Sequence, residues 1–214
     1  MTTPVDKSKA RGYFKFILAI DTETTGLFIN SDMPDYDPTT GKYHQILSIG
    51  LIVLDEHTGD EIDRVYVEVK WDGKSEWSAG AEKVHGLTKQ YLEQNGVTEE
   101  HAVELIGELI LKYWGPTNKL CLLGHNVATF DLWFFRSMFR RHGIELRFGN
   151  RHIDTFSLAQ GTVGAFNSDD LFETIGMDTR GAHNAMDDIV YTVEAYRMIR
   201  RLWNSKVQLK TYEY

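Results

Sequence analysis

The hydrophobic residues of this chain follow two spacings, and the first of them predicts β-strands. Segment 14–21 is apolar on both faces, which is typical of a strand at the centre of a sheet. Segments 46–55 and 61–70 flank the turn residues His-Thr-Gly-Asp and predict a β-hairpin. Two shorter strands are expected at 120–123 and near 151–153.

The second spacing, three to four residues, predicts helices over about 98–113, 130–142 and 185–203. A hairpin followed by alternating strands and helices is typical of an α/β protein. We therefore expect a mixed sheet with helices on both faces.

Two acidic residues, Asp21 and Glu23, follow the first strand directly. Side chains alternate along a strand, so both carboxylates face the same side. Like charges this close repel by several kcal/mol in a low-dielectric setting, and a compensating cation or a shared proton would relieve the repulsion. Oxygen-only ligands suit Mg²⁺ or Mn²⁺. For this pair taken alone, a solvated turn or helix cap is the alternative.

Two further polar blocks contain candidate site residues. GHNVATFD (124–131) follows the apolar run 120–123, and its Asp131 opens a helical pattern. HNAMDD (183–188) places His183 five positions before Asp188, close to the start of the last helix. A helix turns neighbouring side chains by about 100°, so Asp187 and Asp188 do not face the same ion equally well.

In this order, the three blocks resemble the signature of the DnaQ-like DEDDh 3′-to-5′ exonucleases of the ribonuclease H-like superfamily. The resemblance covers most of the chain and includes EKVHGLT (82–88) and HIDTFSLA (152–159). It implies a ribonuclease H-like mixed five-stranded sheet with helices on both faces. It also implies a site for two Mg²⁺ ions, replaceable by Mn²⁺, whose ligands are Asp21, Glu23, Asp131 and Asp188. The family's spacing from His183 selects Asp188, so we expect Asp187 to be a first-turn helix acid.

The resemblance further implies a reaction. Asp21 would bridge the two ions, Glu23 and Asp188 would complete the site of the water-activating ion, and Asp131 would bind the second ion directly or through water. His183 would be the general base, because an unperturbed histidine has a pKa near ~6.5. The expected activity is hydrolysis of single-stranded DNA or RNA 3′ ends to 5′-monophosphates, with DNA slightly favoured. The alternatives are an RNA-trimming ribonuclease or oligoribonuclease and a non-catalytic nucleic-acid-binding or polymerase-associated module.

Five more residues are implied as contacts of the terminal nucleotide. Thr24, Thr25 and Leu27 would touch it, with Leu27 wedged against a base, and His85 and Asn126 would lie nearby. Each has a structural alternative. The threonines would shape the turn after the strand, Leu27 would belong to the core, and His85 would be a hydrogen-bonded loop histidine.

Other residues have both a structural and a nucleic-acid interpretation. The aromatic residues 130, 133, 134 and 135 have helical spacing, which core packing explains better than base stacking. Arginines cluster at 136–151 and basic residues again at 197–210, as a phosphate track or as solvated helix faces. The net charge of −8 argues against a broad electrostatic grip on nucleic acid, but it suits an enzyme that binds only a strand end.

Length and composition predict a single domain over 1–214, because 42% of the residues are hydrophobic and no linker divides the chain. The resemblance implies that it is an exonuclease domain. We expect a flexible tail at 1–12, a long polar loop at 28–44 and a C-terminal tail at 204–214. The single cysteine, Cys121, excludes an internal disulfide and suits a reducing compartment. No apolar leader or run of ~18 apolar residues is present, so we expect a soluble cytoplasmic protein without membrane association.

Overall fold

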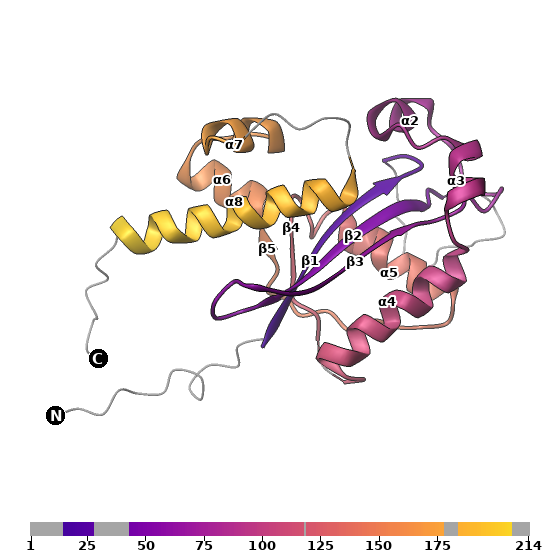
Figure 1. Ribbon diagram of the computed structural model, residues 1–214, viewed down its shortest axis with the longest axis horizontal. Helices are drawn as coiled ribbons and strands as arrows, with labels where there is room; N and C mark the ends of the chain where they lie inside the picture. Colours follow the sequence, from indigo (N-terminus) through magenta and orange to yellow (C-terminus); the bar gives the residue numbers. More distant parts are fainter. Residues whose placement is uncertain (1–14, 28–42, 118, 178–183, 207–214) are drawn as a thin grey trace.

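The computed structural model describes residues 15–27, 43–117, 119–177 and 184–206, with side chains as far as Arg201. These residues form a mixed five-stranded sheet in the spatial order β3-β2-β1-β4-β5 (Figure 1). β2 is antiparallel to both β1 and β3, whereas β4 is parallel to both β1 and β5. The strands are β1 (Phe16–Thr24), β2 (Ile46–Asp55), β3 (Glu61–Glu68), β4 (Leu122–Gly124) and β5 (Ile153–Asp154). The predicted mixed sheet and its hairpin are confirmed.

Seven helices are described in these parts of the chain. Three of them are the long helices that hydrophobic spacing predicts, and the other four are short. The long ones are α4 (Glu99–Trp114), α5 (Asp131–Arg141) and α8 (Ala185–Lys206). The short ones are α2 (Ala79–His85), α3 (Lys89–Asn95), α6 (Thr155–Thr162) and α7 (Ser168–Thr174).

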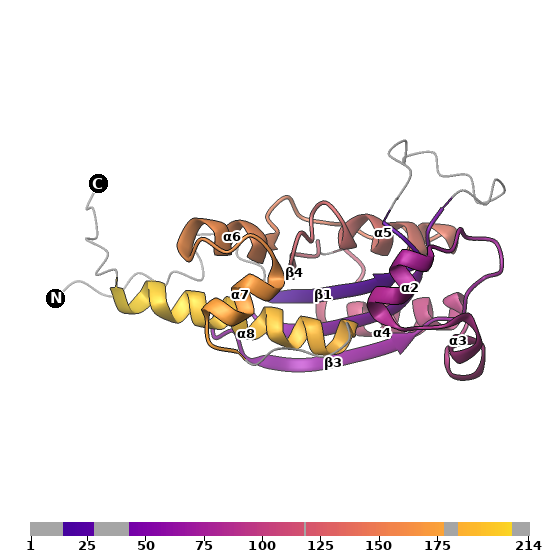
Figure 2. The same cartoon turned by 90° about the horizontal axis from the view of Figure 1, so that it is seen from above.

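The central strand β1 is buried on both faces, and its alternation divides the core in two. Ile17 and Ala19 pack on one face against Ile189 and other residues of α8. Leu18 and Ile20 pack on the opposite face, in the cluster that includes residues of α4 and α5. Figures 1 and 2 show α8 along one side of the sheet and α5 on the other. Full burial of each such aliphatic side chain stabilises the fold by about 1.5–3 kcal/mol. Turning β1 over would expose several of these side chains, so the assignment of residues to the two faces is strongly favoured.

The neighbouring strands differ in burial as their sequences do. β2 is buried along nearly its whole length, between β1 and β3. β3 is one of the two edge strands of the described sheet and is largely exposed. The turn between them is closed by Asp55, whose Oδ1 accepts hydrogen bonds from the backbone N–H groups of His57 and Thr58, both 2.9 Å long. The hairpin joins β2 to β3 in antiparallel register, and β2 also contacts α8.

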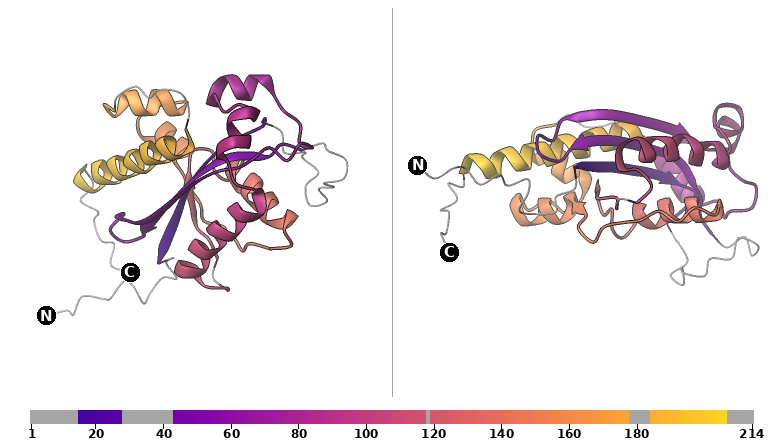
Figure 3. Two further views of the ribbon diagram at one scale, coloured as in Figure 1. Left: turned by 45° about the vertical axis from the view of Figure 1, so that its right-hand side comes forward. Right: turned by 90° about the horizontal axis from the view of Figure 1, so that it is seen from below.

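A third apolar cluster joins α6 and α7 to α8. Ala159, Leu171 and Phe172 are buried there against Ala195 and Ile199 of α8. Figure 3 shows these two short helices close to α8, away from α4. α6 begins directly after β5, in the HIDTFSLA segment, where Asp154 accepts a hydrogen bond from the Phe156 N–H.

Several expected segments lie outside the described residues. These are the tail 1–12, nearly all of the loop 28–44, and the end of the chain after Lys206. α8 extends to Lys206, so the first residues of the predicted C-terminal tail are helical. Among the described helices, none combines the length and apolar character needed to cross a membrane.

Candidate metal-binding active site

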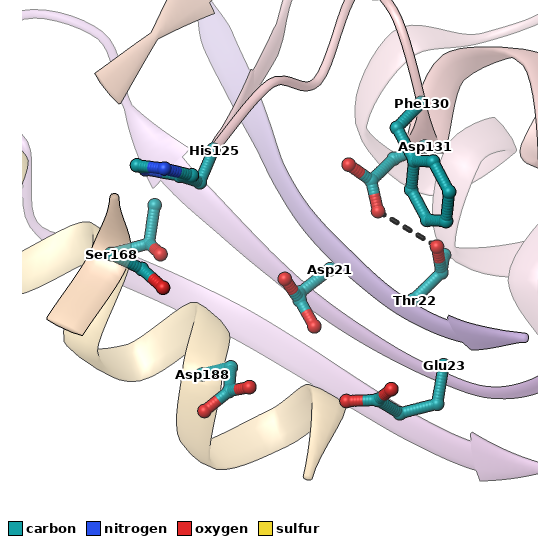
Figure 4. A pocket seen from close by; sticks show the side chains of 9 residues that line it. Asp21, Thr22, Glu23, His125, Phe130, Asp131, Ser168 and Asp188 are labelled. Atoms are coloured by element: carbon teal, nitrogen blue, oxygen red, sulfur yellow. Dashed lines mark hydrogen bonds between the residues drawn. The ribbon is translucent and has the colours of Figure 1, made fainter. Parts of the chain in front are cut away.

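Three acidic side chains meet at the carboxyl end of β1. Asp21 and Glu23 project from the same face of the strand, and Asp188 approaches them from the first turn of α8 (Figure 4). One carboxylate oxygen from each residue lies within 4.8 Å of the other two. Asp188 is buried, whereas Asp21 and Glu23 are partly exposed. Three convergent hard oxygen donors are a set that could hold a divalent cation.

The start of α8 determines which of its two neighbouring acids joins this group. Asn184 caps the helix, because its Oδ1 accepts hydrogen bonds from the N–H of Met186 (2.9 Å) and of Asp187 (3.2 Å). The Asn184 carbonyl also accepts the first helical hydrogen bond, from the N–H of Asp188 (2.8 Å). With the helix begun at this point, Asp188 faces the sheet, while Asp187 is exposed. The expected difference between the two acids agrees with this geometry.

The fourth acid, Asp131, lies across β1 from these three. Thr22 points to the opposite face from Asp21, and its hydroxyl donates a 2.7 Å hydrogen bond to Oδ1 of Asp131, the first residue of α5. Asp131 is only 3% exposed. Burial raises its pKa to about 7, and the hydrogen bond from Thr22 acts in the opposite direction. Asp131 lines the same pocket without belonging to the group of three.

The four acids open onto one pocket of about 150 Å³, a volume below the ~300–1,000 Å³ of typical small-molecule sites. The space suits ions and a phosphate group better than a whole nucleotide. Figure 4 shows Asp21 at its centre, with Asp188 and Glu23 on one side and Asp131 on the other. The remaining lining residues are Thr22, His125, Phe130, Ser168 and Thr192.

His183, the expected general base, lies outside the described residues. Its neighbour Asn184 is described and caps α8. The role of His183 therefore stays a prediction.

The predicted nucleotide contacts at the end of β1 have structural hydrogen bonds. The Thr24 hydroxyl donates to the Gly26 carbonyl (2.8 Å), and the Thr25 hydroxyl accepts from the Gln45 N–H (2.9 Å). Both threonines are buried, so they shape the turn whatever else they contact. Leu27 is 73% exposed, and the alternative that it belongs to the core is wrong.

The other two predicted contacts lie on separate elements. His85 is buried at the end of α2, where its Nδ1 accepts a 2.9 Å hydrogen bond from the Leu87 N–H. Asn126 is exposed, with a φ of 60°, and its N–H donates to Asp154 Oδ1 (3.1 Å). Within the described parts of the chain, the pocket lining includes neither residue, nor Thr24, Thr25 or Leu27.

Some pocket residues were not identified from sequence. Phe130, expected in the core, lines the pocket while its ring packs on Phe134 at a centroid distance of 4.9 Å. His125 lines the opposite wall, with Nδ1 3.2 Å from the Thr155 hydroxyl. Thr192 follows Asp188 by one helical turn, which is a usable sequence signal. No sequence signal indicates Ser168, because only the packing of α7 brings it to the pocket.

Five arginines of the two basic clusters have structural partners. Arg136 and Arg140 both bind Glu145, with nitrogen–oxygen distances of 2.9 and 2.6 Å. Arg141 donates through Nε to the largely buried Glu99 (2.8 Å). Two arginines of the C-terminal cluster donate to backbone carbonyls of the β2–β3 turn, namely Arg197 and Arg200. Fold stabilisation explains these contacts without a phosphate track.

The mixed sheet, with acids gathered where its parallel strands β1 and β4 end, places the protein among α/β proteins of ribonuclease H-like fold. Residues 18–196 match the family model RNase_T, described as Exonuclease. The match covers well over half of the chain, which therefore belongs to this exonuclease family.

Solved structures with the same fold include two bacterial exonucleases I. The zinc-bound complex of Escherichia coli exonuclease I with single-stranded DNA has a TM-score of 0.70 and 19% identity, covering 90% of this chain and 42% of that one. Exonuclease I from Methylocaldum szegediense has a TM-score of 0.66 and 20% identity, covering 87% and 40%. This chain thus spans less than half the length of either.

A 3′-exonuclease that recognises the 3′ end of a histone mRNA stem-loop is also similar, with a TM-score of 0.59 and 18% identity. The match covers 90% of this chain and 66% of that one. At such identities the likeness shows the fold alone. No curated protein sequence matches the chain.

Proposed function

We propose that the protein is a DEDDh-type, metal-dependent 3′-to-5′ exonuclease that removes 5′-monophosphates from single-stranded ends, with DNA slightly favoured over RNA. The observation that carries this proposal is the convergence of Asp21, Glu23 and Asp188 within 4.8 Å, with Asp131 on the other side of β1 in the same pocket. Because the chain belongs to an exonuclease family, phosphodiester hydrolysis is the reaction that this acidic pocket would serve.

The donor set fits divalent metal ions. All four groups are carboxylates, the ligands that Mg²⁺ and Mn²⁺ prefer, and two of the four are buried, namely Asp131 and Asp188. Keeping acids this close, and partly out of water, is costly without a cation. Divalent ions bound there would stabilise negative charge on the attacking and leaving oxygens of the phosphodiester.

The four acids and His183 would have different roles in metal binding and proton transfer. Asp21 would be shared by two ions, with Glu23 and Asp188 completing one ion's ligands and Asp131 serving the other. His183 would take the proton from the attacking water, since its ordinary pKa near ~6.5 leaves it a base at neutral pH. Because the bond to the 3′ oxygen of the preceding nucleotide breaks, the released nucleotide would have a 5′-phosphate.

The comparisons support DNA and RNA unequally. The exonuclease I structures include complexes with single-stranded DNA, and those proteins have the higher TM-scores. RNA trimming is the alternative, because another similar structure is that of a 3′-exonuclease that recognises a histone mRNA stem-loop. A non-catalytic binding module has less support, because none of the four acidic positions is replaced.

The test is degradation of matched single-stranded DNA and RNA, labelled at the 5′ end, with Mg²⁺, Mn²⁺ or EDTA. We expect a ladder of shortened products with either metal, none with EDTA, and faster shortening of DNA. Asp21→Asn prepared in parallel identifies contaminating nuclease, because it should leave both strands intact. Binding without degradation in every metal condition would refute the enzyme, and faster RNA degradation would reverse the substrate preference.

A further inference from the structure

The first turn of α8 touches the sheet at a glycine. An ideal Cβ built on Gly50 of β2 would lie 2.3 Å from the Ala185 carbonyl oxygen and 2.9 Å from Met186 Cα. Ordinary contacts of a Cβ begin at 3.4 Å, so a side chain here would displace the helix by about 1 Å. Gly50 lies within a strand and is not one of the described glycines with positive φ. Space, rather than backbone conformation, is what this glycine provides.

The sheet register places this contact beside the acids. Gly50 is paired with Asp21 of β1 on one side and with Tyr66 of β3 on the other. Directly paired residues of antiparallel strands face the same side of a sheet. Asp21, Gly50 and Tyr66 therefore form one row across the face that α8 covers, and the adjacent row contains Glu23, paired with Ser48.

The outer end of this row is bonded to the helix cap. The Tyr66 hydroxyl accepts a 3.2 Å hydrogen bond from Asn184 Nδ2 and donates a 2.8 Å hydrogen bond to Glu68. The Asn184 Oδ1 accepts the N–H groups that begin α8, so a single amide joins β3 to the first helical turn. That turn also contains Asp188.

We propose that Gly50 and Tyr66 are positioning residues for the metal site: Gly50 lets α8 approach the sheet, Tyr66 fixes its capping residue, and together they place Asp188 against Asp21 and Glu23. The inference rests on the proposed function. Mg²⁺ and Mn²⁺ sites depend on oxygen positions set to a few tenths of an ångström. A helix displaced by about 1 Å would leave Asp188 present but poorly placed as a ligand.

The experiment compares three variants of the full chain with the wild type. Gly50→Ala introduces the clash, and Tyr66→Phe removes one hydroxyl at the largely exposed edge strand. Gly96→Ala is the matched control, because its added Cβ would also meet backbone, 2.8 Å from Leu92 O and 2.9 Å from Lys70 N, away from the pocket. Mn²⁺ binding is measured by electron paramagnetic resonance of the free ion, and the Mg²⁺ dependence of strand degradation is measured in parallel.

We expect Gly50→Ala to weaken Mn²⁺ binding by about 10- to 100-fold, the usual effect of removing support from metal ligands. Its activity should recover partly when Mg²⁺ is raised, because the ligands themselves remain. Tyr66→Phe should weaken Mn²⁺ binding by about 2- to 10-fold, as expected for one hydrogen bond. Gly96→Ala should lower the melting temperature yet bind Mn²⁺ within about twofold of wild type.

Equal Mn²⁺ binding by Gly50→Ala and wild type would overturn the proposal, as would equal losses in Gly50→Ala and Gly96→Ala. If Gly50→Ala does not fold, Tyr66→Phe decides, and an unchanged Mn²⁺ affinity there overturns the proposal. A wild type that binds no Mn²⁺ would instead refute the metal site itself, and the positioning argument with it.

Discussion

Replacing Asp188 with asparagine removes one of three charges whose oxygens lie within 4.8 Å of one another. Two unit charges at that distance repel by about 3 kcal/mol at an effective dielectric constant of ~20 and by about 1 kcal/mol in bulk water. Asp188 is buried, whereas Asp21 and Glu23 are partly exposed, so the effective value lies between these limits. Without metal, Asp188→Asn should therefore melt at or above the wild-type temperature, since 1 kcal/mol corresponds to about 2–4 °C for a chain of this size.

The same substitution should nearly abolish turnover. Asparagine keeps the size of the side chain and one oxygen, but the charge that attracts a divalent cation is gone. Losing several kcal/mol of transition-state stabilisation lowers kcat by roughly 10²-fold or more. Asp21→Asn and Glu23→Gln should behave alike, because each removes a charge from the same group. A fall in activity with no fall in stability separates loss of a ligand from damage to the fold.

The assay measures single-turnover strand degradation and metal-free thermal unfolding for each variant. Asp187→Asn is the control, because Asp187 is exposed on the same helical turn, and it should retain wild-type activity. If two of the three ligand variants kept more than about a tenth of the wild-type kcat, the assignment of these acids to metal binding would be refuted. A collapse of the melting temperature in all three would point instead to a structural role.

The remaining predictions concern the base, the strand end, the metal and one ion pair. His183→Ala should lower kcat by about 10²- to 10⁴-fold and flatten the acidic limb of the pH–rate profile, with Mn²⁺ binding retained; an unaltered profile in a folded, slow variant would reject the base. A closed circular single strand should resist degradation, and linear strands should give products with 5′-phosphates; cleaved circles or 3′-phosphate products would exclude this mode of action. Mg²⁺ at 100 times its Kd should stabilise the wild type by about 2.7 kcal/mol, and Asp21→Asn should lose most of the resulting rise in melting temperature. The hydrogen bonds from Arg140, and to a lesser extent from Arg136, lower the pKa of Glu145 to about 2, so Arg140→Gln should raise that pKa toward ~4.3 in an NMR titration, whereas no change would mean that the Arg140–Glu145 pair does not persist in solution.

The strands and long helices could be predicted because their hydrophobic spacing is repeated over many residues. β2 is buried on both faces and is apolar nearly throughout, while α4 buries Ala102, Val103 and Ile106 at helical intervals. Burial requires such patterns wherever an element crosses the core. The predicted and observed bounds of these elements differ by only a few residues at their ends.

The short helices could not be predicted in this way, because seven or eight residues contain too few buried positions to establish a period. Their ends are set by capping instead. Ser78 caps α2 through a hydrogen bond from Ala81 N–H, and Gly86 ends it in the left-handed conformation, with a φ of 72°. Asn167 caps α7 through Asp170 N–H. Such capping residues occur equally in turns that do not continue as helices.

The candidate site shows the same division between local and tertiary information. Strand alternation places Asp21 and Glu23 on one face and Thr22 on the other, and this much follows from the sequence. The bond from Thr22 to Asp131 does not, because it depends on how α5 packs against the opposite face. Phe130 precedes Asp131 directly, so the same packing brings it to the pocket.

The distance between Asp188 and the β1 acids is likewise a tertiary property, and it explains why four acids in the correct order are not yet a site. A carboxylate in the first turn of α8 reaches β1 only if the helix lies close to β2. Gly50 permits that approach, and the Tyr66–Asn184 hydrogen bond fixes the cap from which the helix begins. A chain with the same acids but a larger residue at position 50 would keep the sequence pattern and lose the geometry. The motif therefore specifies which residues could bind metal, and the residues beneath α8 determine whether they do.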